Sequence, residues 1–113
     1  MKKLEIIVRP GVAAGVRSAI EAAGYPSITI SQVEGHGSQK GLAKEKNNGK
    51  FRLDMVPKMR LDIVIPDSAL DTVVDAVVKT ARTGEPGDGK IFVTDISDVI
   101  RIRTGERGIV AIG

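Results

Sequence analysis

The chain has no cysteine and no tryptophan, and only one tyrosine and two phenylalanines, in 113 residues. The lack of cysteine excludes disulfide bonds, thiolate metal sites and thiol redox chemistry, and it is typical of a cytoplasmic protein. With so few aromatic side chains, the core must be aliphatic. Subunit association is one way for so short a chain to bury more apolar surface.

Long apolar runs are also missing. No stretch approaches the roughly 20 residues of a membrane-spanning helix, and the first residues contain no apolar segment of signal-peptide length. We therefore expect neither a membrane span nor secretion. The composition, 42% apolar and 27% charged residues, predicts one folded domain over residues 1–113.

The charge of the chain is concentrated in one segment. The formal net charge is +3, and residues 38–55 alone hold five Lys and Arg against two Asp and Glu, which is also +3. This segment has no hydrophobic periodicity, and such long irregular segments are usually functional or disordered. We expect residues 37–55 to form a flexible, basic, partner-binding loop.

Apolar residues at alternate positions predict four strands, over residues 4–8, 27–33, 59–65 and 90–96, and a further short extended segment over 99–103. Three- and four-residue spacing predicts helices over 12–23 and from about 68 to 81. Asp67 or Ser68 is the expected N-cap of the second helix, and Gly84 is expected to end the helix in the left-handed C-cap conformation. Phe92 is expected in the core.

The resulting order is βαββαβ with a C-terminal extension over residues 98–113. This order predicts an α+β, ferredoxin-like fold (a split β-α-β arrangement) with both helices on one face of the sheet. Ile7 and Val64 are apolar on the opposite face, which is therefore a candidate subunit interface.

Three clusters are candidates for ligand binding. Gly87-Asp88-Gly89-Lys90 precedes a strand, where glycine conformations can form an anion nest and a lysine adds charge, although the same residues also fit a plain turn. Arg101 and Arg103 project to one side of an extended segment and can clamp a polyanion, or form a solvated pair. Glycines in the segment 35–41 allow close backbone approach to a ligand.

The remaining polar residues do not form a catalytic set. His36 is the only histidine, which is poor support for a metal site made by one chain. Asp95 and Asp98 form a carboxylate pair, but no nucleophile or base is placed beside them, and Asp98 is expected in a turn. We expect a binding protein and not an enzyme.

Together these segments resemble the PII signal-transduction family along nearly the whole chain. The resemblance is carried by Lys2-Lys3, Arg9-Pro10, residues 35–41, Pro57-Lys58, residues 64–67, 83–93 and 99–106. It implies a homotrimer whose sheets face inward, with a nucleotide site between each pair of subunits. The residues it assigns to ATP or ADP are Ile7, Thr29, Gly35, Gly37, Ser38, Gln39, Val64, Gly87, Asp88, Gly89, Lys90, Arg101 and Arg103.

The resemblance also implies 2-oxoglutarate and Mg²⁺ as effector ligands. Gln39 would bind the Mg²⁺ that bridges ATP and 2-oxoglutarate, and Lys58 would pair with the 2-oxoglutarate carboxylate. The 2-oxoglutarate site it implies consists of Arg9, Gln39, Lys40, Gly41 and Lys58. The partner would be an ammonium channel, a nitrogen-regulatory enzyme or another metabolic protein, held by Lys44, Lys46, Asn47, Lys50 and Phe51.

Three positions depart from the family pattern. Ser38 stands where an arginine usually contacts the terminal phosphate, so the preference between ATP and ADP stays open. Phe51 replaces the tyrosine that many members uridylylate, and Gly49 replaces a serine that others phosphorylate. We therefore expect switching by ligand occupancy alone.

Other classes of protein fit the chain less well. The high pI of about 9.4 is compatible with a nucleic-acid partner, but the predicted sheet lacks the stacking aromatics of RNA-binding ferredoxin-like domains. Slow ATP hydrolysis stays open as a side activity, because bound phosphates and Mg²⁺ would lie close together, but without a placed base we do not expect an enzyme. The nearer alternative is a divergent PII-like sensor that reads another metabolite or ion, which Ser38 permits.

Overall fold

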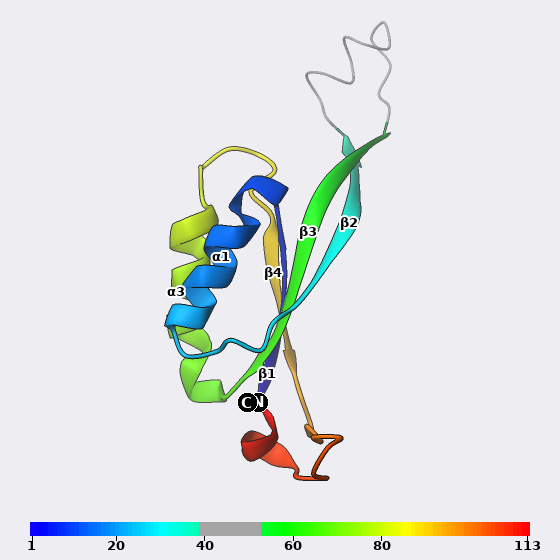
Figure 1. Cartoon of the computed structure of the whole chain (residues 1–113). Helices are drawn as coiled ribbons and strands as arrows, with labels where there is room; N and C mark the ends of the chain where they lie inside the picture. Colours follow the sequence, from blue (N-terminus) through cyan, green and yellow to red (C-terminus); the bar gives the residue numbers. More distant parts are fainter. Residues whose placement is uncertain (39–52) are drawn as a thin grey trace, which may run out of the picture.

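A computed structural model describes residues 1–38 and 53–113, which form one antiparallel sheet with two helices on one face (Figure 1). The strands lie in the order β2-β3-β1-β4. This confirms the predicted α+β, ferredoxin-like fold. The elements along the chain are β1 (Lys2–Val8), α1 (Pro10–Ala22), β2 (Thr29–Ser38), β3 (Leu53–Ile65), η1 (Asp67–Ala69), α3 (Leu70–Ala81), β4 (Lys90–Asp95) and η2 (Gly108–Ala111).

The core lies between the sheet and the two helices. Each element turns its apolar stripe inward, so β1 and β3 bury alternate residues and the helices bury residues three or four apart. Because β-branched residues lower helix propensity, the valine-rich α3 depends on this packing. The buried set of strands and helices is Leu4, Ile6, Val8, Ala13, Val16, Ile20, Leu61, Ile63, Ile65, Val73, Val77 and Ala81.

The helix ends differ from the prediction. Pro10 occupies the first turn of α1, where its missing N–H needs no acceptor. Neither Asp67 nor Ser68 caps α3, because both lie in the short 3₁₀ turn before it and no side chain caps the helix. Gly84 has a positive φ of 88°, as expected, but the helix already ends at Ala81, so Gly84 belongs to the following loop.

The two strands that flank the central segment are longer than predicted. β2 pairs with β3 from Thr29 opposite Asp62 to Ser38 opposite Leu53, so residues 37–38 and 53–55 are strand and not loop. A backbone hydrogen-bond ladder needs no apolar periodicity, so the apolar pattern predicts too early an end for β2 and too late a start for β3. The rest of the predicted loop, residues 39–52, lies outside the described residues.

Three predictions for the C-terminal third are wrong. Phe92 is 50% exposed, because its register partner Glu5 lies on the sheet face opposite the helices. Residues 99–103 are not a strand: a single bridge joins Ile100 to Arg107, and the backbone turns between them. β4 also ends at Asp95, one residue before the predicted end.

The face of the sheet opposite the helices is uncovered in the single chain. Cross-strand pairing places Lys3 beside Val64, Glu5 beside Asp62 and Ile7 beside Arg60 on this face. Ser31 Oγ and Asp62 Oδ1 are buried here without a hydrogen-bond partner in the described chain, and Arg60 Nε forms an ion pair with Asp62 Oδ2 at 3.2 Å. In the described chain, no helix packs over the side chains of this face (Figure 1).

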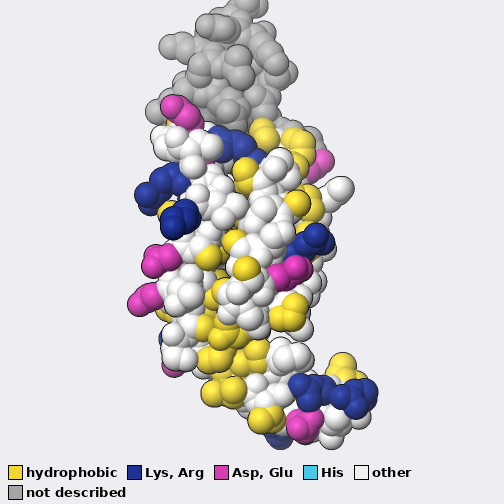
Figure 2. All heavy atoms as spheres, turned by 60° about the vertical axis from the view of Figure 1, so that its left-hand side comes forward, with side chains coloured by type: hydrophobic (Ala, Val, Ile, Leu, Met, Phe, Trp, Pro, Cys, Tyr) yellow, Lys and Arg dark blue, Asp and Glu magenta, His cyan; other side chains and the backbone are white. Residues whose placement is uncertain are grey.

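Apolar side chains also reach the surface at β4 and in the C-terminal segment. Figure 2 shows hydrophobic side chains gathered toward the lower end of the molecule, above a projecting segment that carries Lys and Arg side chains. The exposed large apolar residues of these two regions are Phe92, Val93, Ile100, Ile102, Ile109 and Val110. In the described ranges, no helix combines the length and apolar character needed to cross a membrane.

Candidate functional site

The loop between α3 and β4 has an unusual backbone. Gly84, Gly87 and Gly89 all adopt positive φ, at 88°, 97° and 101°, which glycine alone adopts easily. At Gly89 the loop also passes very close to β1, since a Cβ there would lie 1.8 Å from the Ile7 carbonyl oxygen. Successive glycines in such conformations free backbone N–H groups for an anion, as the sequence predicts for this loop.

The carboxylate of Asp88 lies at the centre of this loop and accepts four hydrogen bonds. Oδ1 accepts from Thr83 Oγ1 at 2.5 Å and from Arg9 Nη1 at 2.6 Å. Oδ2 accepts from the Thr83 N–H at 2.8 Å and the Gly84 N–H at 2.9 Å. These donors, the Thr83 hydroxyl first and the Arg9 guanidinium next, hold the pKa of Asp88 far below its ordinary value of 3.8.

Two cations also hold the loop, one from the end of β1 and one from β3. Arg9 Nη2 donates to the Pro86 carbonyl at 2.7 Å, and Lys58 Nζ donates to the Gly87 carbonyl at 3.0 Å. Lys58 comes from β3, and Gly35 of β2 lies against it, because a Cβ at Gly35 would be 3.4 Å from Lys58 Cγ. The structure thus brings Arg9, Gly35 and Lys58 to the loop.

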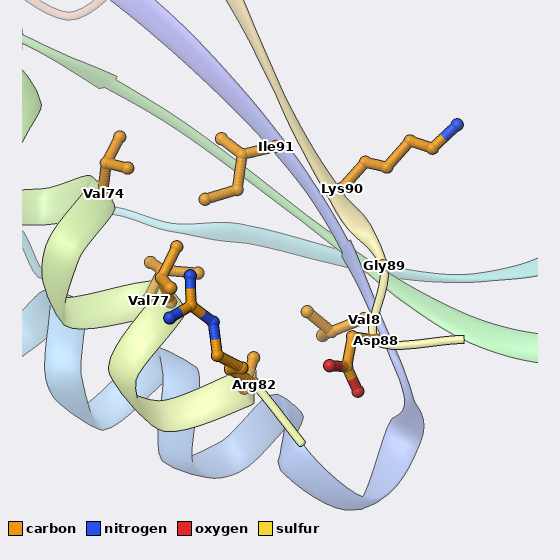
Figure 3. A pocket seen from close by; sticks show the side chains of 10 residues that line it. Val8, Val74, Val77, Arg82, Asp88, Gly89, Lys90 and Ile91 are labelled. Carbon is orange, nitrogen blue, oxygen red and sulfur yellow. The ribbon is translucent and has the colours of Figure 1, made fainter. Parts of the chain in front are cut away.

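Lys90 begins β4 directly after this loop. It pairs with Ile7 of β1, so both side chains lie on the uncovered face of the sheet. In the described residues its ammonium has no hydrogen-bond partner, and Figure 3 shows it directed away from the helices. Lys90 is therefore available to an anion on the uncovered face.

On the helix side, the same loop borders an apolar hollow between α3 and β4 (Figure 3). Its floor consists of valine and isoleucine side chains, and Arg82 and Asp88 lie at its rim. The lining residues include Val8, Val74, Val77, Ala81, Gly89 and Ile91. Val78 and Lys90 complete the lining of this mostly apolar hollow.

Thr29 and Val64 lie toward the other end of the uncovered face. Both line a hollow that also involves Val99 and Ile112 of the C-terminal segment. Val64 is four residues along β3 from Arg60, the partner of Ile7, which at a rise of ~3.3 Å per residue is about 13 Å. Within one chain, Ile7 therefore lies far from Thr29 and Val64.

Arg101 and Arg103 lie beyond the far end of β4 from the glycine loop (Figure 1). Arg101 donates to Glu106 Oε1 at 2.6 Å and to the Val110 carbonyl at 2.7 Å, which binds the C-terminal segment together. Arg103 is exposed and makes no hydrogen bond or ion pair within the described residues. One chain does not bring these arginines to Lys90.

Several predicted site residues cannot be placed with their surroundings. Gly37 and Ser38 end β2, and their side-chain environment is not described. The other predicted residues of this region lie outside the described ranges: Gln39, Lys40, Gly41, Lys44, Lys46, Asn47, Lys50 and Phe51. Elsewhere in the described chain, no group of three His, Cys, Asp or Glu residues is placed to hold a metal ion.

Sequence reasoning missed the role of Thr83. It binds Asp88 through both its hydroxyl and its N–H, although the sequence shows only a threonine between a helix and a turn. The available signal was the spacing, because a Thr or Ser near an Asp in a glycine-rich turn is typical of a side chain that bonds to local backbone.

Acid should weaken the fold through its paired carboxylates. The pKa of Asp88 is lowered chiefly by Thr83, that of Asp98 by Arg107 and that of Glu106 by Thr104, each below ordinary values of 3.8 to 4.5. A lowered folded-state pKa contributes stability that is complete above the unfolded-state value and is lost as pH falls through the folded-state value. The urea concentration at the midpoint of unfolding should therefore stay constant from pH 7 to about pH 5 and should decrease at pH values below about 4.

Asp98→Asn is the test variant for this pH dependence. Asp98 accepts from Arg107 Nε at 2.8 Å, so the variant should be less stable at pH 7 and show a smaller further loss toward pH 3. An identical pH slope in the variant and the parent protein would contradict the assignment.

The comparisons with known proteins agree with one another. The chain matches the family model described as "Nitrogen regulatory protein P-II" over residues 1–106. It is 44% identical over 108 residues to "Nitrogen regulatory protein P-II 2" of Methanothermobacter thermautotrophicus, covering 96% of this chain and 94% of that protein. It is also 44% identical over 112 residues to "Nitrogen regulatory protein P-II 1" of Escherichia coli, covering 99% and 100%.

A solved structure supports the same relationship. The Arabidopsis thaliana PII protein bound to citrate superimposes with a TM-score of 0.76 at 40% identity, over 98% of this chain and 88% of that one.

Proposed function

The chain belongs to the nitrogen regulatory protein P-II family, and from this premise we propose that it is an effector-binding regulator whose nucleotide site forms between subunits. One observation carries the proposal. Gly87 to Lys90 and the arginines at 101 and 103 lie at opposite ends of β4, so they meet only if two chains contribute to one site.

The chemistry of the two half-sites fits ATP or ADP. A triphosphate carries several negative charges, and the glycine loop offers N–H groups while Lys90 and Arg103 offer cations without partners in the described chain. Ile7 on one chain and Thr29 and Val64 on another would enclose the adenine and ribose. The partly exposed apolar side chains of Ile7 and Val64 on the uncovered face support assembly through that face, and we propose that the assembly is a homotrimer.

We assign the second effector to the same end of the sheet. Arg9 and Lys58 provide two cations beside the loop, which suits a dicarboxylate such as 2-oxoglutarate. The related Arabidopsis protein was solved with citrate, another carboxylate. Gln39 is the proposed Mg²⁺ ligand between the two effectors, with further oxygen ligands from the effectors themselves.

Regulation acts through binding and not through catalysis in this proposal. Ligand occupancy selects which nitrogen-metabolism protein the central basic segment holds, and Phe51 has no hydroxyl for uridylylation. The partner would be an ammonium channel, a regulatory enzyme or another metabolic protein.

Calorimetry of the intact protein tests this function. We expect saturable ATP binding with Mg²⁺, and 2-oxoglutarate binding only when Mg²⁺ and ATP are present. GTP is the matched control, because it has the same phosphates and a different base. A folded protein that binds neither ATP nor ADP would contradict the proposal.

A second candidate function is a sensor of another metabolite or ion. The observation that favours it is Ser38, which replaces an arginine expected at the terminal phosphate. This alternative predicts nucleotide binding that 2-oxoglutarate leaves unchanged, so the same titrations separate the two functions.

A further inference from the structure

The four hydrogen bonds at Asp88 have a consequence for how the glycine loop works. Both carboxylate oxygens already accept two donors each, at 2.5 to 2.9 Å. A carboxylate is also repelled by a phosphate, since both are anions. The Asp88 side chain is therefore unsuited to contact the bound phosphates and must act within the loop itself.

The bonds join parts of the chain that are far apart in sequence. Arg9 follows β1, Thr83 and Gly84 follow α3, and Asp88 precedes β4. Arg9 also packs against the loop, because a Cβ at Gly87 would lie 2.9 Å from Arg9 Nη2. We name these four residues, Arg9, Thr83, Gly84 and Asp88, the Asp88 cluster.

A loop of this composition needs such support. Residues 82–89 contain three glycines with positive φ, and glycine loses more conformational freedom on ordering than any other residue. If the loop were ordered only when the ligand arrives, that entropy would be subtracted from the binding free energy. A loop that is already ordered avoids this loss.

We propose that Thr83 and Asp88, with Arg9, are positioning residues that hold the N–H groups of Gly87 and Gly89 in a ligand-ready arrangement before the nucleotide binds. This inference rests on the proposed nucleotide function. It assigns Asp88 to the shape of the loop and gives Thr83 its first role. The inference also means that Arg9 already binds Asp88 and the Pro86 carbonyl before 2-oxoglutarate reaches Arg9.

The low pKa of Asp88 agrees with this geometry. The carboxylate stays ionised throughout the physiological range, so the cluster is not a pH switch near neutrality. The charged and titratable groups that face it are Arg9 from the end of β1 and Lys58 from β3, which reaches the adjacent Gly87 carbonyl.

Two substitutions at Thr83 isolate the hydroxyl. Thr83→Val keeps the shape and removes the donor to Asp88, whereas Thr83→Ser keeps the donor and removes a methyl group. Thr80→Val is the matched control, because the Thr80 hydroxyl donates at 2.9 Å to the Ala76 carbonyl within α3 and lies outside the cluster.

We expect Thr83→Val to bind Mg-ATP about 10-fold more weakly, the effect of one hydrogen bond to a charged group, with Thr83→Ser and Thr80→Val near the parent affinity. In the ligand-free protein, ¹⁵N order parameters of Gly84, Gly87 and Gly89 should fall only in Thr83→Val. Unchanged affinity and unchanged order parameters in Thr83→Val would overturn the inference, as would an equal loss in Thr83→Ser.

Failure of the proposed function is distinguishable from failure of this inference. If the parent protein binds neither ATP nor ADP, the proposed function fails, and the order parameters alone then decide the role of the cluster. Thr83→Val amides as rigid as those of the parent would overturn it, and selectively mobile amides would support it.

Discussion

Gly89→Ala is expected to abolish measurable nucleotide binding and to destabilise the fold more than any other substitution in the glycine loop. The residue has a φ of 101°, which is strained for alanine and costs about 1–3 kcal/mol. Its new Cβ would also lie 1.8 Å from the Ile7 carbonyl oxygen, a distance that real contacts do not reach. The start of β4 must then move away from β1, and Lys90 moves with it.

Two other glycines separate the causes. Gly84→Ala meets the same kind of backbone strain, at a φ of 88°, but nothing lies within 4 Å of its Cβ, so it should cost only the conformational penalty. Gly11→Ala lies in α1 without a positive φ and in open space, and it should stabilise the protein by roughly 0.4–1 kcal/mol. Urea unfolding and ATP calorimetry on the three variants measure both effects. Equal losses in Gly89→Ala and Gly84→Ala would refute the close approach to Ile7.

The second large effect is recovery of binding in mixed oligomers. Lys90→Gln and Arg103→Gln should each weaken Mg-ATP binding about 10- to 100-fold, the range for hydrogen bonds between charged groups. Arg103 is the better target than Arg101, because Arg101 also binds Glu106 and the Val110 carbonyl and its loss would disturb the C-terminal segment.

When the two variants are refolded together and mixed assemblies are isolated by two affinity tags, strong binding should return. A site made from the loop of the Arg103→Gln chain and the arginines of the Lys90→Gln chain contains no substitution. A ring of three with both kinds of chain has one such site, so we expect about one strong site per mixed trimer. Lys79→Gln, an exposed lysine in the last turn of α3, controls for the lost charge. No recovery in mixed assemblies would mean that the two half-sites do not meet between chains.

The fold was largely predictable because the spacing of apolar residues within each strand or helix shows which face is buried. Leu4, Ile6 and Val8 alternate along β1, and the valines of α3 recur at helical spacing, so the residues of each element identify its buried face. The errors occur where a local pattern competes with a distant partner. Phe92 looks like core in its own strand, yet the register with Glu5 places it on the uncovered face.

The candidate site was predictable in part. Glycine and lysine at 87–90 indicate an anion-binding loop from composition alone, and the structure gives two of these glycines positive φ. The Asp88 cluster was not predictable, because Arg9 and Asp88 are 79 residues apart and nothing local announces their bond. Arg101 and Arg103 were expected on one extended segment, but Glu106 and the backbone turn separate their environments.

By itself, the sequence determined the secondary-structure order, the buried faces, the aliphatic core and the glycine loop, since each depends on neighbouring residues and on burial from water. Only the tertiary structure decided that Phe92 lies on the uncovered face, how Asp88 is held, and that the glycine loop and the arginines at 101 and 103 lie at opposite ends of β4. These features depend on strand register and on long-range hydrogen bonds. Both join residues that are distant in the sequence, and no local sequence pattern shows that such residues pair.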